Sequence, residues 1–144
     1  MILKYKMVIH QPNIVLPLSS VFIDMLQQEL SLPPKTSTLS GVTLTFRDAK
    51  RSGKNDGYHP VNIRLVCVDK EWYFDSLVDF RYVQRPYPEM EKEFDVSWSL
   101  GYVWHYIMGQ VSIEMWDSLF EIWQRNFIRY WENNKYVVTS LWDK

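Results

Sequence analysis

The aromatic residues of this chain are placed at the spacings of two strands and one helix. All seven tryptophans lie at or after Trp72, in the second half of a 144-residue sequence. One run carries apolar, mostly aromatic side chains at alternate positions, namely Trp72, Phe74, Val78, Phe80 and Tyr82. A second run alternates over residues 94–107, and a third set recurs at helical spacing from Trp116 to Trp131. Because strands repeat every two residues and helices every three to four, the pattern predicts a sheet covered by a helix.

Two helices are predicted, one near the N-terminus and one before the last strand. The first begins at Ser19 or Ser20, either of which offers an N-cap oxygen, and Pro33-Pro34 ends it. Its apolar stripe consists of Phe22, Met25, Leu26 and Leu30. The second runs over about residues 112–132, and Asn133-Asn134 supplies a left-handed cap after it.

Five stretches have the composition of strands. They are residues 42–46, 61–68, 72–83, 94–107 and 136–142. Gly101 lies inside the fourth stretch and is interpreted as a bulge or bend. Consecutive strands joined by short turns favour an antiparallel sheet. We therefore expect an α+β fold, with a curved antiparallel sheet of about five strands packed by an N-terminal and a long C-terminal helix.

The length of the chain predicts one domain, residues 1–144. Residues 1–18 are expected to form either a strand over Ile2–Ile9 or an irregular N-terminal arm. Residues 48–57 are expected to form a connecting loop, and Arg85–Pro88 cannot be interior sheet because its two prolines remove hydrogen-bond donors.

Composition excludes several classes of partner. Sixteen basic and seventeen acidic residues give a net charge of −1, so no global field attracts nucleic acid or an anionic membrane. No stretch is long and apolar enough to span a membrane, and residues 1–11 have no continuous apolar run, so no secretory signal is expected. Cys67 is the single cysteine, which fits a reducing compartment. We expect a cytoplasmic protein that binds neither nucleic acid nor membrane.

Seven residues are the candidates for ligand binding. They are Tyr58, His59, Asp79, Arg81, Trp98, Trp104 and His105. The two histidines are the best acid–base groups by residue type, but neither a HExxH motif nor a regularly spaced third ligand accompanies them. We therefore expect no metal, no cofactor and no catalytic residue.

The acidic and aromatic candidates each allow two interpretations. Asp75, Asp79 and Arg81 alternate on the strand face opposite the aromatic one, where they form either a solvated surface or a polar pocket with one carboxylate as a base. The tryptophans are either core or the wall of a ligand cavity. Those expected to line it are Trp98 and Trp104, near Gly101, and Trp142, near the end of the chain. Glu93 belongs to an acidic run that is expected to be exposed.

Several segments resemble a known family. They are Gly57–Ile63 (GYHPVNI), Asp79–Tyr82, Pro86-Tyr87, Glu93–Asp95 and Leu119–Phe127 (LFEIWQRNF) with Tyr130. Together they are similar to an uncharacterised bacterial family, DUF2787, found in gamma-proteobacterial genomes and on mobile islands. The resemblance covers about residues 41–142. It implies a curved antiparallel sheet with packed helices, similar to a nuclear-transport-factor-like roll or, alternatively, to the sheet plus helices of mitochondrial matrix glycoproteins. It implies no activity.

Two functional hypotheses follow. The first is a non-enzymatic interaction or accessory protein of a bacterial cell, a homo-oligomer that binds a protein partner. It rests on apolar residues expected on the outer sheet face, at Val66, Val68, Leu77 and Val83. The second is a small-molecule-binding or enzymatic roll, with an aromatic-lined cavity behind Trp72, Trp98 and Trp104.

Overall fold

The computed structural model describes residues 8–10, 16–30, 39–50, 58–83 and 89–143. The helices are α1 (Ser20–Glu29) and α2 (Ile113–Glu132). The strands are β1 (Ile9–His10), β2 (Gly41–Asp48), β3 (Val61–Val68), β4 (Glu71–Val83), β5 (Glu89–Ser97), β6 (Tyr102–His105), β7 (Gly109–Val111) and β8 (Tyr136–Asp143).

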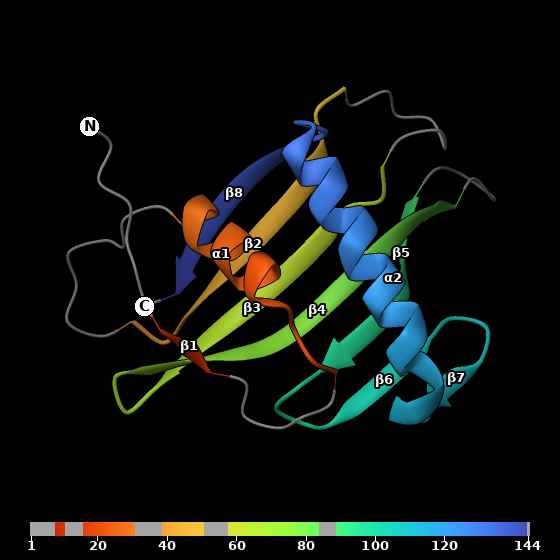
Figure 1. The fold of residues 1–144 in the computed structure, drawn as a ribbon, viewed down its shortest axis with the longest axis horizontal. Helices are drawn as coiled ribbons and strands as arrows, with labels where there is room; N and C mark the ends of the chain where they lie inside the picture. The colour runs from red at the N-terminus through yellow and green to blue at the C-terminus, as the bar shows by residue number, and fades with distance from the viewer. Residues whose placement is uncertain (1–7, 11–15, 31–38, 51–57, 84–88, 144) are drawn as a thin grey trace.

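The strands form one open sheet, and both helices cover the same face of it (Figure 1). Seven strands follow the order β7-β6-β5-β4-β3-β2-β8, and each neighbouring pair is antiparallel. The eighth strand, β1, pairs in parallel with β4. The α+β class is confirmed, but the expected number of about five strands was wrong, because the described residues form a sheet of eight.

The additional strands arise from turns and from a short N-terminal segment. The expected long strand over residues 94–107 is in fact a hairpin of β5 and β6, in which Gly101 adopts a left-handed φ of 73° and its N–H donates to Ser97 O. A second left-handed glycine, Gly109 with a φ of 71°, begins β7. β1 pairs with the start of β4, where Ile9 lies opposite Trp72. β5 pairs with β4 only from Ser76 onward, so the two strands occupy different parts of the same edge of β4.

The predicted helix starts are confirmed. Ser19 Oγ accepts a hydrogen bond from the N–H of Phe22 (3.1 Å), and Ser112 Oγ accepts one from the N–H of Met115 (3.2 Å). Helix α2 is followed by Asn134 in the left-handed region, with a φ of 59°. Three other expectations lie outside the described residues: the stop at Pro33-Pro34, the centre of the 48–57 loop, and the break at 85–88. So do most of residues 1–18.

An extra residue interrupts the alternation of β4. Leu65 of β3 pairs with Phe74, whereas the preceding residue, Arg64, pairs with Ser76. Asp75 therefore has no partner of its own, which is the definition of a β-bulge. A bulge shifts every later side chain of the strand to the other face, because side chains alternate with a period of two.

The bulge determines which residues of β4 face the helices. Trp72 and Phe74 are buried before it, and Leu77 and Asp79 are buried after it, whereas Val78 is half-buried. The alternation predicted for residues 72–82 therefore holds only up to Phe74. Leu77 belongs to the core and not to the outer face, which removes one of the four residues behind the expected apolar outer surface.

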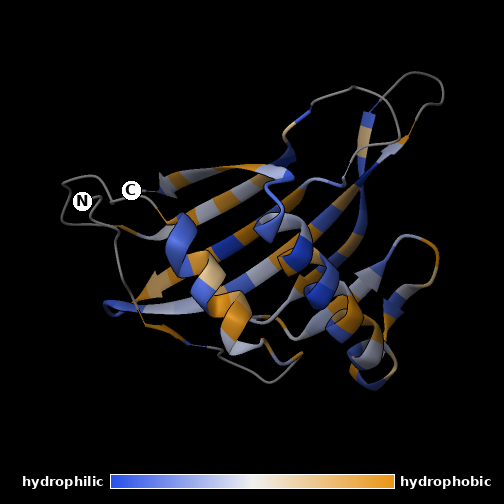
Figure 2. Ribbon diagram, turned by 45° about the horizontal axis from the view of Figure 1, so that its top comes forward, coloured by the Kyte–Doolittle hydropathy of each residue, from blue (hydrophilic) through white to orange (hydrophobic). Residues whose placement is uncertain are grey.

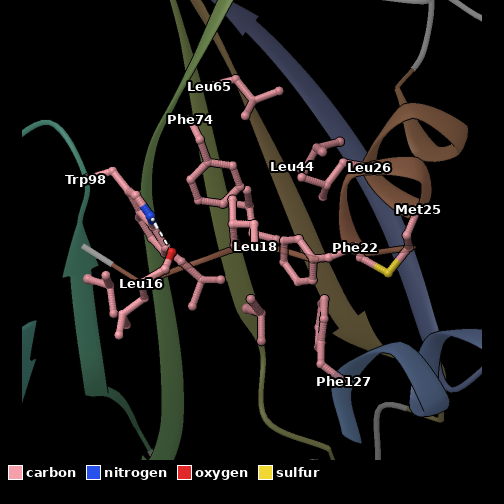
Figure 3. Packing of buried hydrophobic residues seen from close by; sticks show 14 of the residues in the cluster. Leu16, Leu18, Phe22, Met25, Leu26, Leu44, Leu65, Phe74, Trp98 and Phe127 are labelled. Atoms are coloured by element: carbon pink, nitrogen blue, oxygen red, sulfur yellow. Dashed lines mark hydrogen bonds between the residues drawn. The ribbon is translucent and has the colours of Figure 1, made fainter. Parts of the chain in front are cut away.

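The core lies between the sheet and the two helices. Colouring by hydropathy shows apolar and polar positions alternating along the strands (Figure 2). Figure 3 shows Phe22 of α1 among Phe74, Phe127 and the leucines of the sheet. The indole N–H of Trp98 donates to the carbonyl of Leu16 (3.0 Å), which ties the segment before α1 to the end of β5.

We predict that Leu77→Ala lowers the free energy of unfolding by about 2–5 kcal/mol, as expected for a leucine removed from a packed core. Val78→Ala is the matched control on the neighbouring position, with an expected loss of at most about 1 kcal/mol. Urea unfolding of both variants measures the difference. An equal or larger loss in the Val78 variant would show that β4 has no bulge at Asp75.

Candidate functional site

Asp79 is an acidic residue in an otherwise apolar row of the sheet. Reading across β2, β3, β4 and β5, Phe46 pairs with Val61, Val61 with Asp79 and Asp79 with Phe94. All four side chains lie on the helix-covered face, and Asp79 is only 4% exposed. A buried carboxylate is costly unless it is hydrogen-bonded or paired with a charge, so its partners define the site.

A second bulge brings Glu93 towards Asp79. On β5, Phe94 pairs with Asp79 and Lys92 pairs with Phe80, which leaves Glu93 as the extra residue between them. Bulges are common beside functional sites because they re-aim a side chain. Glu93 was expected to be exposed with its acidic neighbours, but it is half-buried, with its carboxylate directed at His59.

His59 completes the cluster from the segment before β3. Its Nδ1 lies 3.2 Å from Asp79 Oδ1 and 2.9 Å from Glu93 Oε2. The following residue is fixed to the sheet, because the N–H of Phe80 donates to the carbonyl of Pro60 (2.9 Å). Pro60 itself has no N–H, so it is tolerated at the entry to β3.

Helix α2 supplies the remaining polar contact. The indole N–H of Trp123 donates to Asp79 Oδ2 (2.7 Å), so each oxygen of this carboxylate has its own N–H partner. Trp123 also stacks on Phe127, with ring centroids 4.8 Å apart. The sheet and the helix are therefore joined through a charged group at the centre of an aromatic layer.

A cavity of about 290 Å³ opens beside these groups. Tyr58, Tyr130 and Tyr136 form one wall, in which the rings of Tyr58 and Tyr130 lie 4.6 Å apart. The remaining lining residues are His59, Asp79, Glu93, Trp123, Asn126 and Phe127. The N–H of Tyr58 donates to Asp48 Oδ2 (2.8 Å), which ties this wall to the end of β2. The cavity is thus aromatic at its sides and charged at one end.

The charged groups shift one another's protonation. Hydrogen bonds to Asp79 first, and then to Glu93, raise the pKa of His59 from 6.5 to about 10. Burial raises the pKa of Asp79, against the opposing effect of its hydrogen bonds with His59 and Trp123. The hydrogen bond with His59 lowers the pKa of Glu93, and burial raises the pKa of Tyr136. The raised pKa of His59 therefore favours its protonated form at neutral pH, with Asp79 and Glu93 as its two acidic neighbours.

Three of the seven sequence candidates meet in this cavity: Tyr58, His59 and Asp79. Arg81 lies further along β4, where it contacts Glu91 Oε2 (3.2 Å) and stacks on the ring of Tyr106. His105 packs against Trp116 near the sheet edge, with ring centroids 5.4 Å apart.

The two tryptophan candidates do not share a cavity. Trp98 is fully buried in the core between the sheet and the helices, and Trp72 is 6% exposed. Trp104 lies on the opposite face of the sheet, which the helices do not cover. Trp104 lines a separate hollow of about 410 Å³ with Lys92, Asp95, Tyr102 and Gln110. Within that hollow Lys92 Nζ already pairs with Asp95 Oδ2 (2.9 Å), so its opposite charges are matched.

Sequence reasoning missed Glu93, Trp123, Asn126, Tyr130 and Tyr136. One indication was available, since four of the segments that carry the family resemblance contribute to the cavity: 57–63, 79–82, 93–95 and 119–127. Spacing alone could not join them, because these segments are distant in sequence and meet only through sheet pairing and the packing of α2 on the sheet.

The fold and the cavity define an α+β protein with an open sheet, two helices on one face and a charged aromatic pocket between them. The chain belongs to the family described as "Protein of unknown function (DUF2787)", which matches residues 20–140. No curated protein matches the chain. Among the described residues, neither helix has the length and apolar character needed to cross a membrane.

Two solved structures from Vibrio cholerae are similar to this chain. The first is the hypothetical protein VC0508 from the VSP-II pathogenicity island, with a TM-score of 0.79 and 24% identity over 90% of this chain and 95% of that one. The second is the conserved hypothetical protein VC1805 from pathogenicity island VPI-2, with a TM-score of 0.69 and 25% identity over 88% and 95%. That protein is described as sharing structural homology with human P32, a mitochondrial matrix glycoprotein. Of the two expected architectures, the sheet plus helices is the one supported.

We predict that His59 makes stability fall as the pH rises. Its pKa in the folded protein, about 10, lies above the unfolded value of 6.5, so its contribution is complete below pH 6.5 and is lost by about pH 10. Urea unfolding across this range should show the stability advantage of the wild type over His59→Gln shrinking with pH. A constant difference between the two proteins would contradict the ion pairs described above.

Proposed function

We propose that this protein is a non-enzymatic binding protein that takes a small cation in the cavity beside His59, Asp79 and Glu93. The observation that carries the proposal is the convergence of two carboxylates on one imidazole in an aromatic-walled cavity. Two acidic side chains face a single basic one here, so the cluster offers more acidic than basic groups to a cationic ligand.

The walls of the cavity favour the same class of ligand. The faces of tyrosine and tryptophan rings attract cations through their electrostatic quadrupole, most strongly where water is excluded. Tyr58, Tyr130, Tyr136 and Trp123 all line the cavity next to the carboxylates. An anion would meet both the carboxylates and the ring faces, and each of these repels it.

The protonation of the cluster supports binding in place of catalysis. An effective general base has a pKa near the working pH, but the pKa of His59 is raised to about 10. Its Nδ1 already faces the oxygens of two carboxyl groups, and Trp123 donates to the other oxygen of Asp79. The relatives from pathogenicity islands support an accessory role in a bacterial cell, and the lone Cys67 fits a cytoplasmic location.

We predict that small organic cations raise the melting temperature of the protein and that Asp79→Asn abolishes the rise. Choline, tetramethylammonium and putrescine are suitable probes, each compared with an uncharged alcohol of similar size. A ligand at 100 times its Kd would stabilise the native state by about 2.7 kcal/mol. Glu91→Gln, which removes an exposed carboxylate outside the cavity, is the matched control. If neither these cations nor metal ions shift the melting temperature, the proposed function is wrong.

A second function, self-association, is favoured by the outer face of α2. Met115, Leu119 and Ile122 are each at least half exposed and lie at helical spacing. Beside them the first half of the helix carries Glu114, Asp117 and Glu121, and the second half carries Arg125 and Arg129 before the terminal Glu132. A twofold axis that pairs two copies of α2 antiparallel would place acidic half against basic half. We propose a homodimer through this face, which could also accept a protein partner.

We predict that Leu119→Glu converts a dimer into a monomer, because it puts a charge at the centre of the apolar stripe. Size-exclusion chromatography with light scattering measures the change. Leu100→Glu, at an exposed turn between β5 and β6, is the matched control and should leave the mass unchanged. A monomeric wild type, or equal dissociation by both variants, would contradict the dimer.

A further inference from the structure

The two carboxylates of the cavity are directed at the same imidazole nitrogen. His59 Nδ1 faces Asp79 Oδ1 at 3.2 Å and Glu93 Oε2 at 2.9 Å. A ring nitrogen carries at most one hydrogen, so it cannot give both acceptors a straight hydrogen bond. All three donor atoms lie within 4.8 Å of one another. An ion placed between them would contact all three at once, which a single proton cannot do.

Two of the three separations among these atoms match the spacing of ligands around a metal ion. With metal–ligand bonds of about 2.0–2.2 Å, tetrahedral ligands lie about 3.3 Å apart and octahedral ligands about 3.0 Å apart. The two distances from His59 Nδ1, 2.9 and 3.2 Å, differ from these values by a few tenths of an ångström at most. The third separation, between the two carboxylate oxygens, is within 4.8 Å, so the side chains would close around the ion as it binds.

We propose that His59 Nδ1, Asp79 Oδ1 and Glu93 Oε2 bind a divalent first-row transition metal ion. This assignment rests on the proposed cation-binding function and names the cation. A neutral imidazole with two carboxylates balances a charge of +2, and the ion takes the place of the Nδ1 proton. Mixed imidazole and carboxylate ligands suit zinc, manganese or iron, whereas magnesium and calcium prefer oxygen alone.

The surroundings hold the ligands as a metal site requires. Trp123 donates to Asp79 Oδ2 (2.7 Å), which leaves Oδ1 for the ion and fixes the plane of the carboxylate. Asp79 and Glu93 are on paired strands, and the burial of Asp79 separates the site from ordinary exposed acidic clusters. The side of the ion away from these ligands would face the cavity, where water or an organic ligand can complete its coordination.

Metal titration of the full chain tests the assignment. The protein is dialysed against a chelator and then titrated with Zn²⁺ and with Mn²⁺ in a calorimeter, and Co²⁺ serves as a probe through its visible absorption. We expect one ion per chain. Glu93→Gln should weaken binding at least about 10-fold, and Trp123→Phe, which keeps the ligands but frees Asp79, by about 10–100-fold. Glu91→Gln on the same strand should bind as the wild type does.

The outcomes separate this inference from the proposed function. Absence of stoichiometric binding by the wild type, or equal affinity in the Glu93 and Glu91 variants, would overturn the metal assignment. If organic cations still raise the melting temperature in that case, the cation-binding function stands without the metal. If neither class of cation binds, both are overturned. Circular dichroism and the melting temperature of each variant show that a loss of binding is not a loss of folding.

Discussion

The bulge at Asp75 is the constraint on which the site and much of the core depend. Without it, the alternation of β4 would place Asp79 on the open face of the sheet, in contact with water. With it, Leu77 enters the core and Asp79 is buried in a row with Val61 and Phe94. The extra residue therefore creates a buried carboxylate, and the fold must then provide partners for that charge.

Those partners come from three distant parts of the chain, and each also performs a structural task. His59 precedes the strand that pairs with β4, Glu93 is the extra residue of β5, and Trp123 packs α2 onto the sheet. The hydrogen bond that satisfies Asp79 therefore also fixes α2 on the sheet. The same arrangement places two acidic side chains against one histidine beside a wall of tyrosines, so the groups that stabilise the fold also favour a cation.

Helix α2 combines two surfaces of different character. Its inner side carries Trp123 and Phe127 towards the cavity and the core, while Leu119 and Ile122 point outwards. Similar structures in the two Vibrio cholerae proteins show that the open sheet with covering helices is shared across sequences about one-quarter identical. Because one fold can host unrelated functions, the chemistry must be argued from the cavity itself and not from the architecture.

The sequence by itself determined the α+β class, both helix starts and most strand positions. Local rules govern these features, such as the caps at Ser19 and Ser112 and the alternation along β2 and β3. It also selected Tyr58, His59 and Asp79 as candidates by residue type. Only the tertiary structure decided that Asp79 is buried and that Glu93 and Trp123 join it. The extra residue moves all later side chains of β4 to the opposite face of the sheet. It can be recognised only from the pairing of β4 with β3, and no pattern within β4 itself shows it.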